Sequence, residues 1–160
     1  MFVTGHSKGG GIAPLAAWRL ANKEGLPVEV VTFAAPKSGN DDFMDAYHES
    51  RIDHIRYEYA ADIVPHLPPS GFFTKILRVL AARDPRFAKF MTLSYQPVGT
   101  LDFIDWSGHV VLDSPDLGLR RIINLLTLIA TFKEDVIVAD HAIDCGGGYM
   151  DAICPTGVCP

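Results

Sequence analysis

One serine of this chain stands in a setting that could make its hydroxyl a nucleophile. Ser7 lies at the centre of Gly5-His6-Ser7-Lys8-Gly9, after a short apolar run and before an alanine-rich stretch. The pattern predicts a strand, a sharp turn and a helix, with glycines that let strand and helix approach closely. Such a turn holds the serine in a strained conformation with its hydroxyl clear of the sheet. We expect Ser7 to be a catalytic nucleophile, Gly5, Gly9 and Gly10 to be structural residues of the turn, and His6 to pack under it.

A serine hydroxyl is a weak nucleophile and needs two partners. A histidine takes its proton, and a carboxylate fixes the tautomer of that histidine and stabilises the imidazolium. Asp62 is the favoured acid because it follows a predicted strand, where parallel sheets place functional loops, and because rigid prolines follow it. Five other acids satisfy chain order alone: Asp53, Asp102, Asp105, Asp113 and Asp116.

Several histidines could serve as the general base. Besides His6, they are His48, His54, His66, His109 and His141. In the chain order serine, acid, histidine, His48 and His54 come too early, and His66 lies too close to the acid in sequence. His109, in a turn before an apolar run, and His141 remain as alternatives.

The elements that must position these residues alternate between strands and helices. Strands are expected at 28–33, 52–59 and 93–104, the last interrupted at 97–99, and helices at 12–23, 40–48, 72–90 and 117–138. Gly25 stands in a helix-stop position, and Asn40 or Asp41 could cap the second helix. The alternation predicts an α/β fold, a mostly parallel sheet flanked by helices. We expect one partial domain over 1–144 and a Gly-, Cys- and Pro-rich tail over 145–160.

Five segments, in order, resemble the class 3 lipases, the fungal-lipase-like branch of the α/β-hydrolases. They are Val3–Gly10, Val31–Asn40, Ala61–Pro69, Tyr95–Thr100 and Asp140-His141, with Pro97 where histidine is common in the family. The resemblance implies an α/β-hydrolase-type sheet and a catalytic triad of Ser7, Asp62 and His141. It also implies a serine hydrolase that cleaves carboxylic esters of lipids through an acyl-enzyme.

The resemblance covers only the second half of the family's domain. We therefore expect the N-terminal strands and the lid to be missing and Met1 to be an internal start. One oxyanion donor is expected from the backbone N–H of Lys8, and the second from a loop that precedes this sequence in the family. Losing one donor costs about 3 kcal/mol of transition-state stabilisation, so the isolated chain is expected to be a poor catalyst. The alternative is a non-catalytic lipase-like module with a binding or regulatory role.

Composition excludes some partners and leaves others open. The formal net charge of −5 and the absence of a basic tail argue against nucleic-acid binding. No signal peptide is evident, and the longest apolar stretch, 122–132, is too short to cross a bilayer, so localisation and oligomeric state stay open.

The cysteines do not predict a metal or disulfide framework. The three of them, Cys145, Cys154 and Cys159, form no Cys-x-x-Cys pair, although Cys154 and Cys159 could close a small loop. A zinc site would need His141, which is assigned to the triad, so no metal or cofactor is expected.

The segment 72–90 carries basic residues among aromatic and aliphatic ones. Such a segment could rest on a lipid surface beside the active site. An ordinary surface helix with a solvated charged face is the favoured interpretation.

Overall fold

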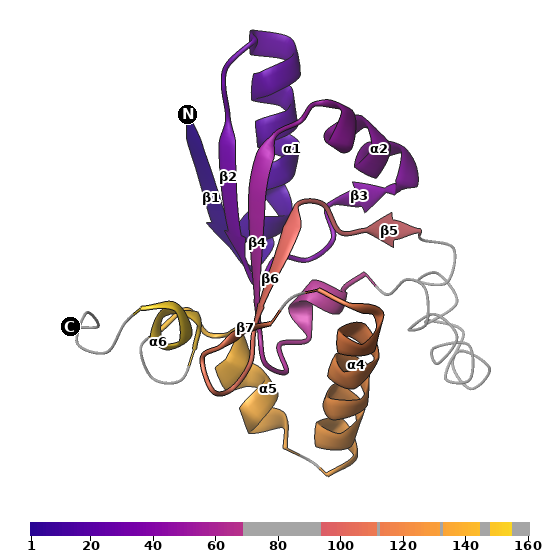
Figure 1. The fold of residues 1–160 in the computed structure, drawn as a ribbon, viewed down its shortest axis with the longest axis vertical. Helices are drawn as coiled ribbons and strands as arrows, with labels where there is room; N and C mark the ends of the chain where they lie inside the picture. The colour runs from indigo at the N-terminus through magenta and orange to yellow at the C-terminus, as the bar shows by residue number, and fades with distance from the viewer. Residues whose placement is uncertain (69–93, 112, 132, 145–147, 155–160) are drawn as a thin grey trace.

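A five-stranded sheet forms the centre of the protein (Figure 1). The computed structural model describes residues 1–68, 94–111, 113–131, 133–144 and 148–154. The strand order is β1 (Phe2–His6), β2 (Glu29–Phe33), β4 (Asp53–Tyr59), β6 (Thr100–Ile104) and β7 (Val110–Val111). The first four strands are parallel and β7 runs antiparallel to β6, which confirms the expected α/β class.

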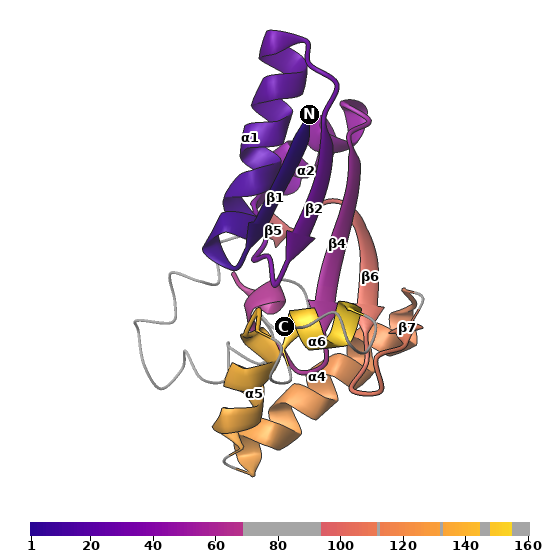
Figure 2. The same cartoon turned by 90° about the vertical axis from the view of Figure 1, so that its left-hand side faces the viewer.

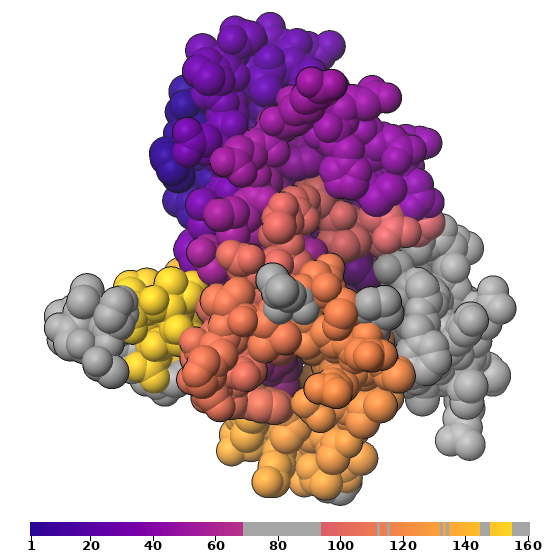
Figure 3. Space-filling model, in the orientation of Figure 1, coloured from indigo at the N-terminus to yellow at the C-terminus, as the bar shows by residue number. Residues whose placement is uncertain are grey.

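Helices follow strands in the first part of the chain, whereas β5 (Tyr95–Gln96), β6 and β7 come in succession before the last three helices. The helices are α1 (Lys8–Glu24), α2 (Asp41–Glu49), the 3-10 turn η1 (Val64–His66), α4 (Pro115–Ala130), α5 (Glu134–His141) and α6 (Tyr149–Ile153). Two short strands, β3 (Gly39–Asn40) and β5, form a separate antiparallel pair. Atoms of α4 and of the β6–β7 region adjoin one another on the surface in Figure 3. No helix in the described part of the chain is long and apolar enough to cross a membrane.

Local sequence signals set the helix ends. Gly25 closes α1 with φ of 64°, a left-handed conformation that glycine adopts without steric cost. The side chain of Asn40 accepts a hydrogen bond from the backbone N–H of Phe43 at 3.1 Å and so caps α2. Both ends agree with the sequence-based expectation.

Small residues let α1 lie close against one face of the sheet (Figure 2). Ala13 and Ala17 of α1 pack on Val28 and Val30 in one buried cluster. A second cluster joins Ala34, Tyr59, Ala60, Ile104 and Tyr149 at the carboxyl ends of the strands. The first cluster holds helix to sheet, and the second supports the loops that leave the sheet.

The strand expected over 93–104 is divided into β5 and β6 at the expected interruption, 97–99, where Gly99 has φ of 87°. The two parts belong to different sheets, which was not expected. One other expectation, on a helix, was wrong. The helix expected over 117–138 is two helices, because the chain breaks after Ala130 and α5 turns back toward the sheet (Figure 1). Apolar periodicity continues through that break, which is why the sequence pattern did not reveal it. The helix expected over 72–90 lies outside the described residues.

A buried polar trio links β2, β4 and α2. The imidazole of His54 is hydrogen-bonded to the hydroxyl of Thr32 at 3.0 Å through Nε2 and to the hydroxyl of Tyr47 at 3.1 Å through Nδ1. All three side chains are buried. Burial, with a smaller contribution from Arg56, lowers the pKa of His54 from 6.5 to about 4, so the folded protein keeps this ring neutral.

We expect acid to destabilise the fold through His54. The unfolded chain binds the proton near pH 6.5 and the folded chain only near pH 4, so His54 contributes its full stability above pH 6.5 and loses it as the pH falls to 4. The loss amounts to about 3 kcal/mol. Urea unfolding measured across this pH range should show it.

The control for this effect is His48, an exposed histidine of α2. His48→Gln should leave the pH dependence unchanged, whereas His54→Gln should flatten it. Burial also lowers the pKa of His66, to about 3, so some slope should remain in both variants. Identical pH profiles for the two variants would contradict the role assigned to His54.

Candidate active site

The three residues expected to form a triad lie together at the carboxyl ends of the parallel strands. Figure 1 shows α5 reaching this end of the sheet. Ser7 directly follows β1, Asp62 lies three residues beyond the end of β4, and His141 is the last residue of α5. Loops at the carboxyl ends of parallel strands are the usual location of functional residues in α/β folds. The return of α5 to this edge of the sheet, after the break that follows α4, brings His141 to the same place.

Ser7 has the strained backbone expected of a sharp strand-to-helix turn. Its φ is 55° and its ψ is −126°, a conformation that non-glycine residues seldom adopt. The turn is fixed on both sides: the N–H of Ser7 donates to the carbonyl of Phe33 at 3.0 Å, and its own carbonyl accepts from Gly11 at 3.1 Å. Lys8 opens α1, so its backbone N–H is one of the first-turn donors that the helix itself leaves unpaired.

Close packing explains two of the three glycines of this turn. A Cβ at Gly5 would collide with the backbone of Gly9, and a Cβ at Gly10 would lie 2.8 Å from the Cβ of Ala35. A Cβ at Gly9 would meet nothing within 4 Å in the described structure. Close approach of strand and helix therefore requires glycine at Gly5 and Gly10. The expectation that it also requires glycine at Gly9 was wrong.

The hydrogen bonds expected between the three residues are present. Nε2 of His141 lies 2.9 Å from Oγ of Ser7. Nδ1 of the same ring lies 3.0 Å and 3.1 Å from the two carboxylate oxygens of Asp62. The geometry thus brings together a hydroxyl, an imidazole and a carboxylate in the order that activation of a serine requires. The catalytic roles of the three residues remain predictions.

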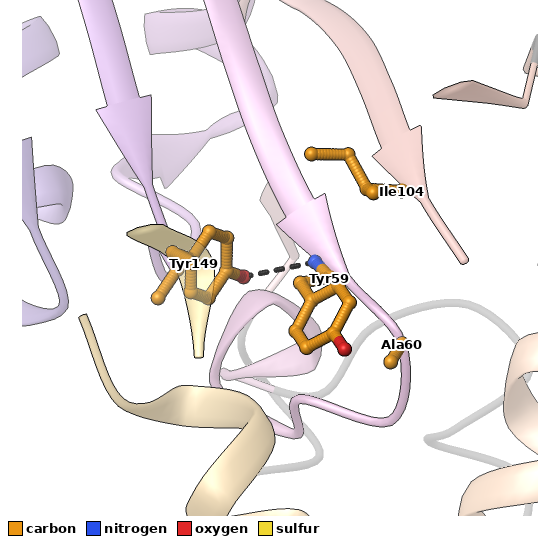
Figure 4. Close-up of a cluster of buried hydrophobic side chains, with 5 residues drawn as sticks. Tyr59, Ala60, Ile104 and Tyr149 are labelled. Atoms are coloured by element: carbon orange, nitrogen blue, oxygen red, sulfur yellow. Dashed lines mark hydrogen bonds between the residues drawn. The ribbon is translucent and has the colours of Figure 1, made fainter. Parts of the chain in front are cut away.

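Asp62 is buried, with 1% of its surface exposed, and its carboxylate is fully engaged. Oδ1 accepts from the backbone N–H of Val64 at 2.9 Å, and Oδ2 accepts from the phenolic hydroxyl of Tyr149 at 2.8 Å. The hydroxyl of Tyr149 in turn accepts the backbone N–H of Tyr59 at 3.0 Å (Figure 4). These donors hold the carboxylate oriented toward His141.

Sequence reasoning missed Tyr149. It lies in the tail 145–160, which the glycines, cysteines and prolines indicated to be loop-like, yet residues Tyr149–Ile153 form α6. The N–H of Tyr149 donates to the carbonyl of Ala142 at 2.9 Å, which brings the chain back beside His141. Burial and the neighbouring Asp62 raise the pKa of Tyr149 well above its usual value, so the phenol stays protonated and can donate. A tyrosine shortly after the Asp-His pair was the only signal available.

Asp140 is a second residue whose role was not expected. Its carboxylate, 4% exposed, accepts from the backbone N–H of Ala61 at 2.9 Å and from the indole N–H of Trp106 at 3.2 Å. Burial raises the pKa of Asp140, partly offset by these two hydrogen bonds. Because Ala61 precedes Asp62 and Asp140 precedes His141, this side chain ties the loop of the acid to the helix of the base.

The remaining histidines are placed elsewhere. His6 extends under the turn, with its Nε2 2.8 Å from the backbone carbonyl of His141 and the two rings 5.0 Å apart, as expected of a packing residue. His109 is exposed and lies 3.8 Å from Asp105, so the structure does not bring it to Ser7. His54 belongs to the buried trio, and His48 is exposed on α2.

Three other expectations concern metal ligands, the cysteines and the segment 72–90, and some of these residues lie outside the described part of the chain. No group of three or more histidine, cysteine, aspartate or glutamate side chains able to hold a metal ion occurs among the described residues. Cys154 is a free thiol there, whereas Cys145 and Cys159 lie outside the described residues. The segment 72–90, expected to be a surface helix or a lipid contact, also lies outside them, with the described chain ending at Pro68 and resuming at Ser94.

Comparison with known families identifies a match over the first part of the chain. Residues 1–72 match the family described as lipase (class 3). This range contains Ser7 and Asp62, together with three of the five segments on which the resemblance was based. The match confirms the expected resemblance for this range.

The curated relatives that match this chain are also lipases or phospholipases. A lipase of Caenorhabditis elegans is 39% identical over 71 residues, 42% of this chain and 20% of that protein. A secreted mono- and diacylglycerol lipase of Fusarium solani is 40% identical over 70 residues, 44% of this chain and 21% of that protein. A phospholipase A1 of rice is 32% identical over 102 residues, 56% of this chain and 25% of that protein. The chain thus spans about a fifth to a quarter of the length of these relatives.

A solved structure extends the likeness in three dimensions. It is a triacylglycerol lipase whose catalytic centre is described as a serine protease triad. It is 31% identical, with a TM-score of 0.51, and the match covers 69% of this chain and 36% of the other. The mostly parallel sheet with flanking helices therefore corresponds to part of a lipase fold.

The neighbouring glycines of the turn provide a first test. Gly10→Ala should lower the free energy of unfolding by about 1–3 kcal/mol, because the added Cβ overpacks against Ala35. Gly9→Ala is the matched control and should be neutral or stabilising by up to about 1 kcal/mol, since alanine favours the helix. The free energy of unfolding of both variants is measured with urea. A larger loss in Gly9→Ala than in Gly10→Ala would contradict the steric role assigned to Gly10.

The phenol of Tyr149 provides a second test. Tyr149→Phe should destabilise the protein by about 1–3 kcal/mol, because the buried N–H of Tyr59 loses its acceptor and Asp62 loses a donor. Tyr57→Phe is the control. Tyr57 is half-buried, and its ring stacks on that of Phe33 with 5.5 Å between the ring centroids. Removing the hydroxyl of Tyr57 should change the free energy of unfolding by less than about 0.5 kcal/mol. Equal losses in the two variants, measured by urea unfolding, would rule out this role of Tyr149.

Proposed function

We propose, from the class 3 lipase match of residues 1–72, that this chain carries the catalytic residues of a serine hydrolase that cleaves carboxylic esters of lipids. Ser7 is the nucleophile, His141 the general base and Asp62 the residue that orients the base. The observation that carries the proposal is the hydrogen-bonded series from Ser7 through His141 to Asp62, with donor–acceptor distances of 2.9 Å and 3.0 Å.

The reaction begins with proton transfer from Ser7. As Oγ attacks the ester carbonyl carbon, its proton moves to Nε2 of His141, and the carbonyl oxygen becomes an oxyanion. The backbone N–H of Lys8, at the start of α1, is suited to donate to that oxyanion, and the positive end of the helix dipole favours the negative charge. Collapse of the intermediate breaks the ester C–O bond, and His141 gives its proton to the leaving alcohol.

The acyl-enzyme is then hydrolysed by the same groups. His141 removes a proton from a water molecule, the resulting hydroxide attacks the acyl carbon, and Oγ of Ser7 leaves with the proton returned by His141. The fatty acid is released and Ser7 is restored. The proposed reaction needs no metal or cofactor.

Asp62 is proposed to select the reactive tautomer of His141. A carboxylate can only accept, so Nδ1 carries the proton and Nε2 is left with the lone pair that receives the proton of Ser7. In the imidazolium formed during attack, the negative charge of Asp62 stabilises the positive ring. The two further donors on Asp62, from Val64 and Tyr149, fix the carboxylate and limit its reorganisation.

The substrate class comes from the relatives. The names of the proteins to which this chain is similar include a mono- and diacylglycerol lipase and a phospholipase A1. We therefore propose an ester of a glycerolipid as the substrate. For the segment 72–90, the sequence favours an ordinary surface helix over a contact with the lipid surface.

A fluorophosphonate probe tests the nucleophile without requiring full turnover. The probe should label Ser7 covalently, and Ser7→Ala should abolish labelling. His141→Ala should reduce the labelling rate by several orders of magnitude, because the residues act as a unit. Asp62→Asn should reduce it about 10⁴-fold by imposing the wrong tautomer. The rates are measured by mass spectrometry of the intact protein.

His109→Ala is the control, since the side chain of His109 is exposed and lies against Asp105, and this variant should label at the unchanged rate. Labelling that survives Ser7→Ala, or that His109→Ala removes while His141→Ala does not, would overturn the site. A folded wild-type chain that takes up no probe would favour the alternative function, a non-catalytic module with a binding or regulatory role.

A further inference from the structure

His6, the residue directly before Ser7, contacts the backbone of the proposed general base. Its Nε2 lies 2.8 Å from the backbone carbonyl oxygen of His141. A carbonyl oxygen can only accept, so Nε2 of His6 carries a proton and donates the hydrogen bond. This nitrogen is therefore not available to take a proton from Ser7, and the contact gives His6 a role other than that of a base.

The carbonyl that His6 contacts belongs to the last residue of α5. The last carbonyls of a helix have no partner within the helix and depend on donors from elsewhere. His6 supplies such a donor from the end of β1. The next carbonyl, that of Ala142, accepts from the backbone N–H of Tyr149 at 2.9 Å. Two donors from distant parts of the chain thus fix the end of α5.

α5 depends on such contacts because it is short. It has 8 residues, fewer than an isolated helix needs to be stable in water. No side chain of the described residues caps its N-terminus, and among its described side chains those of Ile137 and Asp140 are the buried ones. The position of His141, at the end of this helix, is therefore set by its contacts with other elements.

The turn at Ser7 brings two consecutive residues to His141. Successive side chains of a regular strand point to opposite faces of the sheet. Ser7 departs from that conformation with φ of 55°. Its hydroxyl reaches Nε2 of the His141 ring, and the ring of His6 reaches the carbonyl of the same residue. The ring of His6 is itself held by Tyr149, which packs edge-on against it with 6.0 Å between the ring centroids.

We propose that His6 is a positioning residue for the ester hydrolysis, and this inference rests on that proposed function. By donating to the carbonyl of His141, His6 holds the end of α5 against the strand that carries Ser7. Nε2 of His141 then stays within hydrogen-bond distance of Oγ of Ser7. A displacement of about 1 Å between reacting groups can slow a reaction about 10²-fold, so one backbone contact at this place is sufficient to affect the rate.

Three substitutions of His6 separate its donor nitrogen from its ring. His6→Phe keeps an aromatic ring without the donor, and His6→Asn carries an amide too short to reach the carbonyl. Each should slow fluorophosphonate labelling of Ser7 about 10- to 100-fold. His6→Gln places an amide N–H near the position of Nε2 and should restore most of the labelling rate. His48→Asn, which removes an exposed histidine of α2, is the matched control and should label like the wild type.

Urea unfolding shows which variants fold, and His6→Asn takes the place of His6→Phe if the latter does not. If the ring of His6 served only for packing, His6→Phe would label at the wild-type rate and His6→Gln would be slow. That result would overturn the proposal. Slow labelling by both His6→Phe and His6→Asn, with recovery in His6→Gln, would support it.

A second measurement does not require the reaction. The proton that Nδ1 of His141 shares with Asp62 can be followed by NMR. Its resonance should broaden or disappear in His6→Phe and His6→Asn, where the end of α5 is released, and remain in His6→Gln. A wild type that takes up no probe would count against the proposed function, and the resonance would still test His6. An unchanged resonance in all three variants would overturn the positioning role.

Discussion

The buried carboxylate of Asp62 is the group on which the arrangement of the site depends. A charge held at 1% exposure is tolerated only if several donors compensate for the lost water. Here the donors come from three directions: the 3-10 turn through Val64, α5 through His141 and α6 through Tyr149. His141 and Tyr149 lie 79 and 87 residues beyond Asp62 in the sequence, so satisfying this carboxylate requires α5 and α6 to fold back to the carboxyl ends of the strands.

Backbone strain accumulates at the same edge. Ser7, Ala34 and Ala60 all have φ between 45° and 55°, and each lies directly after the end of β1, β2 or β4. Residues in this conformation cost of order 1–3 kcal/mol each and persist where surrounding contacts fix them. The second hydrophobic cluster, which contains Ala34, Ala60 and Tyr149, supplies those contacts. Packing at the carboxyl ends therefore stabilises the turns that aim the side chains.

The residues of the site differ in how far sequence could predict them. Ser7, Asp62 and His141 stand in motifs whose spacing reflects local turns, and the structure brings them within hydrogen-bond distance. Tyr149 and Asp140 act through contacts that join segments about 80 to 90 residues apart, which no local pattern encodes. The break between α4 and α5 was missed for the same reason: the apolar repeat continues, and only the tertiary position of His141 requires the chain to turn.

The hydrogen bond from His141 to Asp62 can be observed directly by proton NMR. A proton held between Nδ1 and the carboxylate, shielded from exchange by burial, should give a resonance well downfield of the amide region. The account predicts this resonance in the wild type and in Ser7→Ala, and its loss in Asp62→Ala and His141→Gln. A downfield resonance that persists in Asp62→Ala, or its absence from the folded wild type at every pH and temperature at which the protein is stable, would contradict the central claim.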